Sequence, residues 1–282
     1  MFFVVDYAFD NFLESAKYVK TISSTSGSVR GIANLGDEIF VVRSGNASIQ
    51  VYKRNSDDVT VQRSINVGSG SSSFRGLAAC ELNQCLYVSE SGNQTIHKVS
   101  PVTNNRVKRW SMDGQPFGVS VNSAHNLLVA VYNTHRILEY TTDGAVVRKI
   151  NLQPDITNPA HVVQLQGGEF GVTQHGSVHR YCVVGSDGKI VKSTGSGEVS
   201  SPYGFIVSKG GKAFVADYGH NRVLLLNSKT LSVVKLPAVF NVSFNTPYCI
   251  HFDASAGVMY ISECGSTSHI QCFQMCQKAK SA

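Results

Sequence analysis

The stretch SPYGFIVSKGGKAFVADYGHNRVLLLN, at residues 201–227, predicts three short β-strands. Two apolar runs flank a Lys-Gly-Gly turn, and a polar loop then leads into a third apolar run. β-Branched and aromatic residues fill the runs, while glycine and other turn-forming residues separate them. The stretch therefore predicts a small antiparallel sheet, which needs neighbours to bury its faces.

Five other segments of the chain repeat this pattern in weaker form. The residues that mark the same point in each first strand are Gly31, Gly76, Gly118, His161, Gly204 and Cys249, at intervals of 45, 42, 43, 43 and 45 residues. Units continue through a glycine turn, such as TDG at 142–144 or SDG at 186–188, into a fourth strand. Helical periodicity is nearly absent, which excludes helical solenoids of similar period.

Four strands in a unit of about 43 residues are typical of a propeller blade. We therefore predict an all-β fold, a six-bladed β-propeller of four-stranded antiparallel blades that spans residues 15–276. The sixth unit ends after its third strand, near Phe273, whereas SAKYVKTIS at 15–23 has the alternation of a fourth strand. We expect this N-terminal strand to complete the last blade and remove an open sheet edge.

The two ends of the chain are assigned outside the ring. Residues 1–14 resemble part of unit five, either as a remnant of a longer array or as an added edge strand. A seven-bladed ring that lacks pieces is the alternative to six blades. Residues 277–282 are predicted to be a tail.

The units resemble the NHL repeat, which has a Pro-x-Gly start, a Val-Ala-Asp second strand and an Asn-His-Arg loop. The best matches lie in units five and three, at Pro202, Gly204, Val215, Ala216, Asp217, His220, Asn221 and Arg222, and at Pro116, Gly118, Asn133, His135 and Arg136. The resemblance implies a propeller similar to that of TRIM-NHL proteins, which bind protein or RNA through one face. This sequence contains no RING, B-box or coiled-coil segment, and the resemblance is specific for fold but not for activity.

In such a blade, the residue between Pro and Gly, the end of the second strand and the loop that follows it meet on one face of the ring. Loops of this kind are common binding surfaces. The predicted partner-binding residues at these positions are Arg30, Arg43, Arg75, Phe117, Tyr203 and Tyr248. The alternative is structural: the aromatic side chains plug the channel, and the arginines pair with Glu90 or with carbonyl groups.

These residues favour a non-enzymatic module that recognises a protein partner. Arginines beside aromatic rings would also suit single-stranded RNA, which is the second hypothesis. The third is a metal-dependent lyase or lactonase-type hydrolase with its site at the axis. NHL-type amidating lyases bring three histidines to a zinc ion, but only His161 occupies a comparable place here.

Other candidate chemistry is incomplete in the sequence. His161, His175 and His179 are interpreted as polar loop histidines near the axis and one solvent-facing strand residue, rather than as metal ligands. Glu90, Asp217 and Glu263 could imitate the ligand set of gluconolactonase-like propellers only if they turned inward, and Asp217 is expected to bond loop amides instead. No nucleophile elbow, His-Glu-x-x-His motif or phosphate loop occurs, so we predict no catalytic residues, metal or cofactor.

The composition says more about the cellular compartment and the general class of partner than about the function. A net charge of +6 mildly favours anionic partners but falls short of a nucleic-acid footprint, and no DNA or membrane partner is expected. An odd number of cysteines, seven, without a secretory signal favours a cytoplasmic protein, although sequons at Asn46, Asn93 and Asn241 leave secretion open. The propeller is expected to be a monomer. Cys80 and Cys85 are expected to flank one hairpin turn, and RVKRW at 106–110 is expected to form an outer strand.

Overall fold

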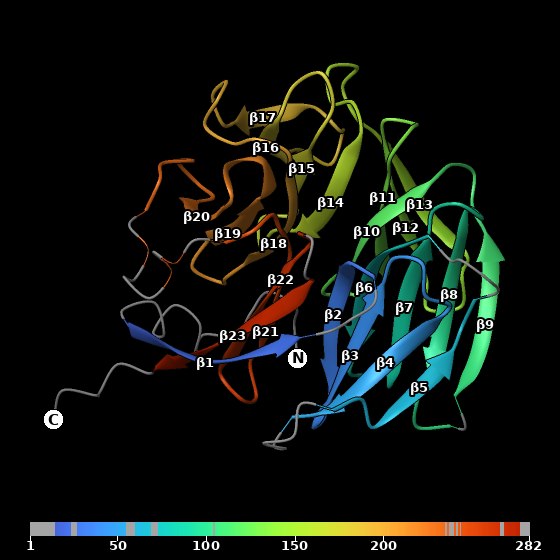
Figure 1. The fold of residues 1–282 in the computed structure, drawn as a ribbon. Helices are drawn as coiled ribbons and strands as arrows, with labels where there is room; N and C mark the ends of the chain where they lie inside the picture. Colours follow the sequence, from blue (N-terminus) through green and yellow to red (C-terminus); the bar gives the residue numbers. More distant parts are fainter. Residues whose placement is uncertain are drawn as a thin grey trace, which may run out of the picture.

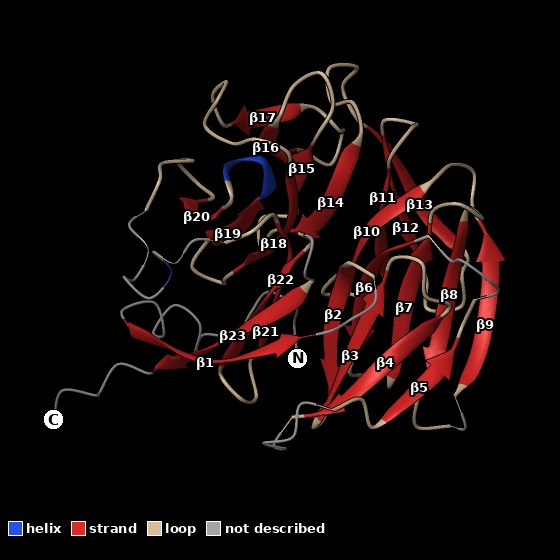
Figure 2. Cartoon of the chain, in the orientation of Figure 1, coloured by secondary structure: helices blue, strands red, loops and turns tan. Residues whose placement is uncertain are grey.

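The computed structural model forms a ring of small antiparallel sheets around one axis (Figure 1). It describes residues 15–23, 27–54, 60–68, 73–103, 105–234, 236, 240, 242, 244–265 and 268–276. Residues 1–14 and 277–282, which the sequence assigned to an extension and a tail, lie outside this part. Figure 2 shows that the regular secondary structure of the described chain is almost all strand, joined by loops and turns, with short 3₁₀ turns such as η1 (Tyr218–His220).

Each of the first three blades contains four strands, ordered from the axis outward as they occur in the chain. Blade 1 consists of β2 (Val29–Leu35), β3 (Glu38–Arg43), β4 (Ser48–Lys53) and β5 (Arg63–Asn66). Blade 2 consists of β6 (Phe74–Cys80), β7 (Cys85–Glu90), β8 (Thr95–Ser100) and β9 (Arg106–Ser111). Blade 3 consists of β10 (Pro116–Val121), β11 (Leu127–Val131), β12 (Arg136–Tyr140) and β13 (Val146–Asn151).

The remaining blades follow the same plan with two variations. Blade 4 consists of β14 (Pro159–Gln164), β15 (Phe170–Gln174), β16 (Arg180–Val184) and β17 (Ile190–Ser193). Blade 5 contains β18 (Pro202–Val207), β19 (Lys212–Asp217) and β20 (Arg222–Asn227), and a single bridge between Leu226 and Val233 stands where a fourth strand was expected. Blade 6 contains β21 (Pro247–Asp253), β22 (Val258–Glu263) and β23 (His269–Cys276), with its outer strand supplied from the N-terminal side.

The strand β1 (Ser15–Ser23) closes the ring, as the sequence predicted. It pairs antiparallel with β23 from Ser15 opposite Cys276 to Ser23 opposite His269. The first and last described strands therefore share one sheet and lie side by side in Figure 1. This arrangement confirms the six-bladed fold and ties both ends of the described chain into one blade.

The described core is divided among the blades. Each pair of adjacent blades buries its own apolar cluster, because alternate residues of a strand point to opposite sheet faces. In β7, for example, Leu86 and Val88 pack toward blade 1, whereas Cys85 and Tyr87 pack toward blade 3. The second strands are buried on both faces, which explains their nearly continuous apolar sequences.

Glycines at the start of the first strands allow neighbouring blades to approach closely. A Cβ atom on Gly76 would lie 2.9 Å from the carbonyl oxygen of Phe117 in blade 3. On Gly204 it would lie 2.9 Å from the Cα atom of Cys249 in blade 6. Real Cβ atoms do not approach backbone atoms this closely, so the glycine of Pro-x-Gly sets the spacing between innermost strands.

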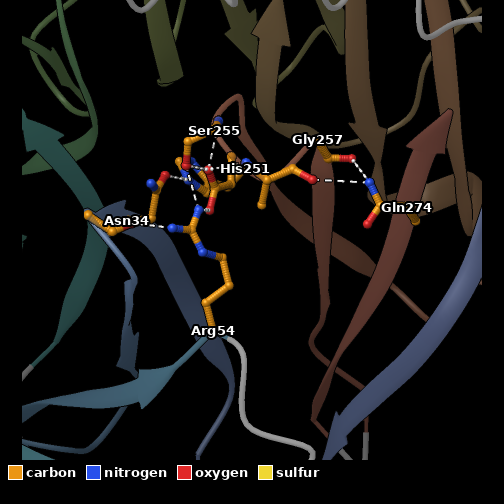
Figure 3. Close-up of polar contacts among 9 residues, drawn as sticks. Asn34, Arg54, His251, Ser255, Gly257 and Gln274 are labelled. Atoms are coloured by element: carbon orange, nitrogen blue, oxygen red, sulfur yellow. Dashed lines mark hydrogen bonds and ion pairs between the residues drawn. The ribbon is translucent and has the colours of Figure 1, made fainter. Parts of the chain in front are cut away.

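Polar contacts reinforce the junction where blade 6 meets blade 1 (Figure 3). The Nη1 atom of Arg54 donates to Oδ2 of Asp253 over 2.7 Å, and the Asp253 side chain is fully buried. Nearby, Nε2 of His251 lies 2.7 Å from Oδ1 of Asn34. The two blades that are most distant in sequence are therefore joined by hydrogen bonds as well as by apolar packing.

Candidate functional site

The residues between Pro and Gly gather at the axis as a set of stacked groups. The ring of Tyr203 stacks on Tyr248 at 4.5 Å and on Phe117 at 6.1 Å between centroids. At the two ends of this row, the guanidinium of Arg30 lies 4.5 Å from the Tyr248 centroid, and that of Arg75 lies 5.1 Å from the Phe117 centroid. We call these five residues the stacked arc.

One small residue and two hydrogen bonds between blades fix the positions of the arc residues. Ala160 holds the corresponding position in blade 4, and its methyl group leaves room for Phe117 and Tyr203 to meet from blades 3 and 5. The hydroxyl of Thr173 donates to the carbonyl oxygen of Tyr203 over 2.5 Å. Ser89 donates in the same way to the carbonyl oxygen of Phe117. These bonds run between adjacent blades, so the arc rests on a rigid backbone.

The arc borders a small axial cavity of about 50 Å³. All five arc residues line it, together with His161, Cys249, and glycines and apolar residues of the first strands, and none of these described lining residues is acidic. Among the described residues, Arg30 and Arg75 form no ion pair, and the buried Nε atom of each has no hydrogen-bond partner. The cavity therefore faces two positive charges that the described protein does not neutralise.

Arg43, which was predicted to bind a partner, does not reach this cavity. Its side chain is fully buried, where Nε donates to Oε1 of Gln50 over 2.7 Å and Nη1 donates to the carbonyl oxygen of Gly27 over 3.2 Å. The side chain thus joins the end of β3 to β4 and to the preceding loop. Strand position alone did not reveal that this side chain turns into the blade.

The same position carries a buried polar group in four other blades. Glu90 accepts from Asn93 over 2.9 Å and lies 2.7 Å from Nε2 of His97. The other members of the set are Gln174, Asp217 and Glu263, which bond Arg180, Arg222 and Gln271 respectively. Each joins its second strand to the third, so these side chains hold the blade together and do not converge on the axis.

The structure confirms the prediction that Asp217 bonds a loop amide. Its Oδ1 atom accepts from the backbone N–H of Ser200 over 2.6 Å, and its Oδ2 atom accepts from Nε of Arg222 over 2.8 Å. His220, which the NHL resemblance places in this loop, lies 2.9 Å from the same Oδ2 atom. In unit five, the Asp-His-Arg pattern therefore forms a hydrogen-bonded network that stabilises the loop.

A second row of residues surrounds the arc, and sequence reasoning had named only His175 among them, as a candidate histidine. Tyr132 stacks on Phe117 at 5.1 Å, and Tyr218 meets Tyr203 edge to face at 5.3 Å. His175 lies 4.6 Å from the Tyr203 centroid, and Cys264 packs in the same axial cluster. Each of these four residues directly follows a second strand. This shared position, one residue beyond the strand end, was the signal that could have found them.

The three candidate histidines of unit four do not form a metal centre in this structure. In His161, Nδ1 accepts from the backbone N–H of Phe205 over 3.4 Å, which leaves Nε2 to donate to the carbonyl oxygen of Val119 over 3.2 Å. Both ring nitrogens are thus engaged between blades. Within the part of the chain that the structure describes, no group of three or more His, Cys, Asp or Glu residues is placed to hold a metal ion.

Two other features that the sequence analysis named, the cysteine pair and the basic segment, lie within the strands of blade 2. Cys80 and Cys85 face one another across the β6–β7 hairpin as free, buried thiols. The RVKRW segment lies in β9, the outer strand of blade 2, as predicted. Among the described residues, no helix is long and apolar enough to cross a membrane.

Buried histidines give the fold an expected pH dependence. Burial lowers the pKa of His161 to about 4, whereas histidine in an unfolded chain titrates near 6.5. The unfolded chain therefore binds more protons between these values, and the free energy of unfolding should fall as the pH falls from about 6.5 to about 4. In His161→Gln, this slope should decrease by up to about 1.4 kcal/mol per pH unit. Urea unfolding at several pH values measures the slope, and equal slopes would contradict the assignment.

Comparison with known proteins gives the class of fold. Neither a family model nor a curated protein sequence matches the chain. Virginiamycin B lyase from Staphylococcus aureus is 13% identical with a TM-score of 0.67, over 93% of this chain and 100% of that one. A streptogramin B lyase is 14% identical with a TM-score of 0.68, over 94% and 90% of the two chains.

A third solved structure has the same fold and a different chemistry. The PQQ-bound aldose sugar dehydrogenase from Streptomyces coelicolor is 13% identical with a TM-score of 0.66, over 92% of this chain and 98% of that one. At such low identity, these likenesses show the fold alone. The protein is a six-bladed β-propeller, and its function has to be argued from its own residues.

Proposed function

We propose that this chain is an NHL-type propeller that recognises a protein partner, without catalysis, through the axial face formed by the stacked arc. The carrying observation is that two arginines without acidic partners share one cavity with three stacked aromatic rings. Arginine and tyrosine are enriched where protein interfaces concentrate their binding energy. Their placement on a rigid backbone lowers the entropic cost of binding.

The geometry favours a protein partner over single-stranded RNA. Base stacking needs an open ring face, but Phe117 is only 7% exposed and Tyr248 only 3% exposed. The ring of Tyr203 stacks on both of them, and each carries a guanidinium group as well. The faces of these rings are therefore already in contact with other groups of the protein.

The geometry also favours recognition over metal-assisted chemistry. Glu90, Asp217 and Glu263, the acids expected in a lactonase-like set, are bonded within their own blades. His161 uses both ring nitrogens between blades. The residues that such an enzyme would need are therefore occupied in structural roles.

Site-specific photocrosslinking tests the proposed function. We expect p-benzoylphenylalanine in place of Tyr218, which borders the arc, to capture a discrete partner in an extract of the source cells. The adduct should be sensitive to protease and resistant to ribonuclease. Mass spectrometry of the adduct would identify the partner.

The control carries the same crosslinker in place of Val147, an exposed residue of the outer strand β13. Equal labelling at the two sites would contradict an axial interface. A ribonuclease-sensitive adduct at Tyr218 would instead establish RNA as the partner.

A further inference from the structure

The stacked arc is open at one place, between its two arginines. Arg30 of β2 makes a cation–π contact with Tyr248 of blade 6. Arg75 of β6 makes the same kind of contact with Phe117 of blade 3. Blades 1 and 2 are adjacent, so the two guanidinium groups lie over flanking blades on either side of the gap. Each guanidinium group thus contacts a ring of the blade on its far side, blade 6 for Arg30 and blade 3 for Arg75.

The positive charges of Arg30 and Arg75 both face the axial cavity. Burial raises the pKa of Tyr203 and of Tyr248, and the guanidinium groups of Arg30 and Arg75 both act to lower it. Partial burial of a cation has a desolvation cost, which contact with an aromatic face offsets. The unpartnered Nε atoms add to that cost. Each arginine therefore keeps a buried donor that a ligand could accept from.

We infer that this gap is a carboxylate-binding site, and that the partner inserts the side chain of an aspartate or glutamate between Arg30 and Arg75. The inference rests on the proposed function, because it names the chemistry by which the protein partner is recognised. Net charge of +6 would assist the approach of an acidic segment.

The shape of the site matches this group. A guanidinium that stacks face-on against a ring keeps its N–H donors in its own plane, where they can meet a carboxylate edge-on. The cavity of about 50 Å³ is small, and both arginines line it, which suits a group as small as a carboxylate. The buried hydroxyl of Tyr248, beside the Arg30 guanidinium, provides a further polar group at the cavity wall.

The experiment uses the full chain and a phage-displayed library of random 12-residue peptides. We expect selection to enrich peptides that contain an essential Asp or Glu. In fluorescence anisotropy, changing that residue to Asn or Gln should weaken binding by about 30-fold or more, as expected when one partner of a desolvated charge pair is removed.

Three variants separate a bidentate site from general attraction. Arg30→Gln with Arg75→Gln should abolish the preference for the acid, and the double variant should be no less stable to urea than the parent because uncompensated charges are removed. Arg30→Lys with Arg75→Lys keeps the charge but loses the planar fork, so it should still bind weakly. The matched control is Arg106→Gln with Lys149→Gln, on exposed outer strands, which should bind like the parent.

The outcomes distinguish this inference from the proposed function. If peptides bind and depend on Tyr203 but tolerate loss of their acid, the carboxylate site is overturned and protein recognition stands. If the crosslink at Tyr218 also fails, both are overturned. If a labelled pool of single-stranded RNA 8-mers binds in an Arg30- and Arg75-dependent manner and no acidic peptide does, the anion is a phosphate and the inference is wrong. A marked loss of stability in the Gln double variant would assign the arginines a structural role.

Discussion

Replacing Ile22 with alanine is expected to lower the free energy of unfolding by about 2 to 5 kcal/mol. Ile22 lies in β1, opposite Ile270 of β23, and is 2% exposed. It packs with Ile39 and Tyr52 of blade 1, so it contributes to the core between the first and last blades. The substitution removes apolar contacts where the ring is closed by hydrogen bonds rather than by continuous chain. Urea unfolding followed by tryptophan fluorescence measures the effect.

The control is on the same strand. Val19 lies at the irregularity between Tyr18 and Lys20 and is 49% exposed, so Val19→Ala should change stability by less than about 0.5 kcal/mol. Similar small effects for both variants would show that β1 adds little to ring closure. That result would contradict the importance assigned to the closing strand.

Gly118→Ala is expected to destabilise the protein by about 3 kcal/mol or more, because the added methyl group meets backbone that cannot move independently. A Cβ atom at Gly118 would clash with the carbonyl oxygen of Ala160 and lie 2.8 Å from the Cα atom of His161. Relief would require blades 3 and 4 to separate at the axis. The variant should therefore show a lower Tm and, because Ala160 lies between Phe117 and Tyr203, a disturbed stacked arc.

Gly167→Ala provides the matched comparison. Gly167 lies in a hairpin turn of blade 4, and the nearest atom to an added Cβ there is 3.9 Å away. With space available, loss of glycine should reduce the entropy of the unfolded chain and change stability by no more than about 1 kcal/mol, in the stabilising direction. If Gly118→Ala were equally harmless, close approach would not be the reason for glycine at this position.

The sequence predicted much of the axial site because one repeat position maps to one place in the ring. Arg30, Arg75, Phe117, Tyr203 and Tyr248 share that position, and the structure brings all five to one cavity. Arg43 was misplaced because a strand end does not specify which way its side chain turns. Its direction depends on Gln50 and the carbonyl oxygen of Gly27, which only folding brings beside it.

The sequence by itself determined the repeat, the number of blades and the closing strand. These features follow from local strand and turn patterns and from a regular interval of about 43 residues. Only the tertiary structure decided how the arc is stacked, that its two arginines lack acidic partners, and that the acids of the second strands face into their blades. These properties depend on which side chains of different blades meet at the axis, and no local pattern records those distances.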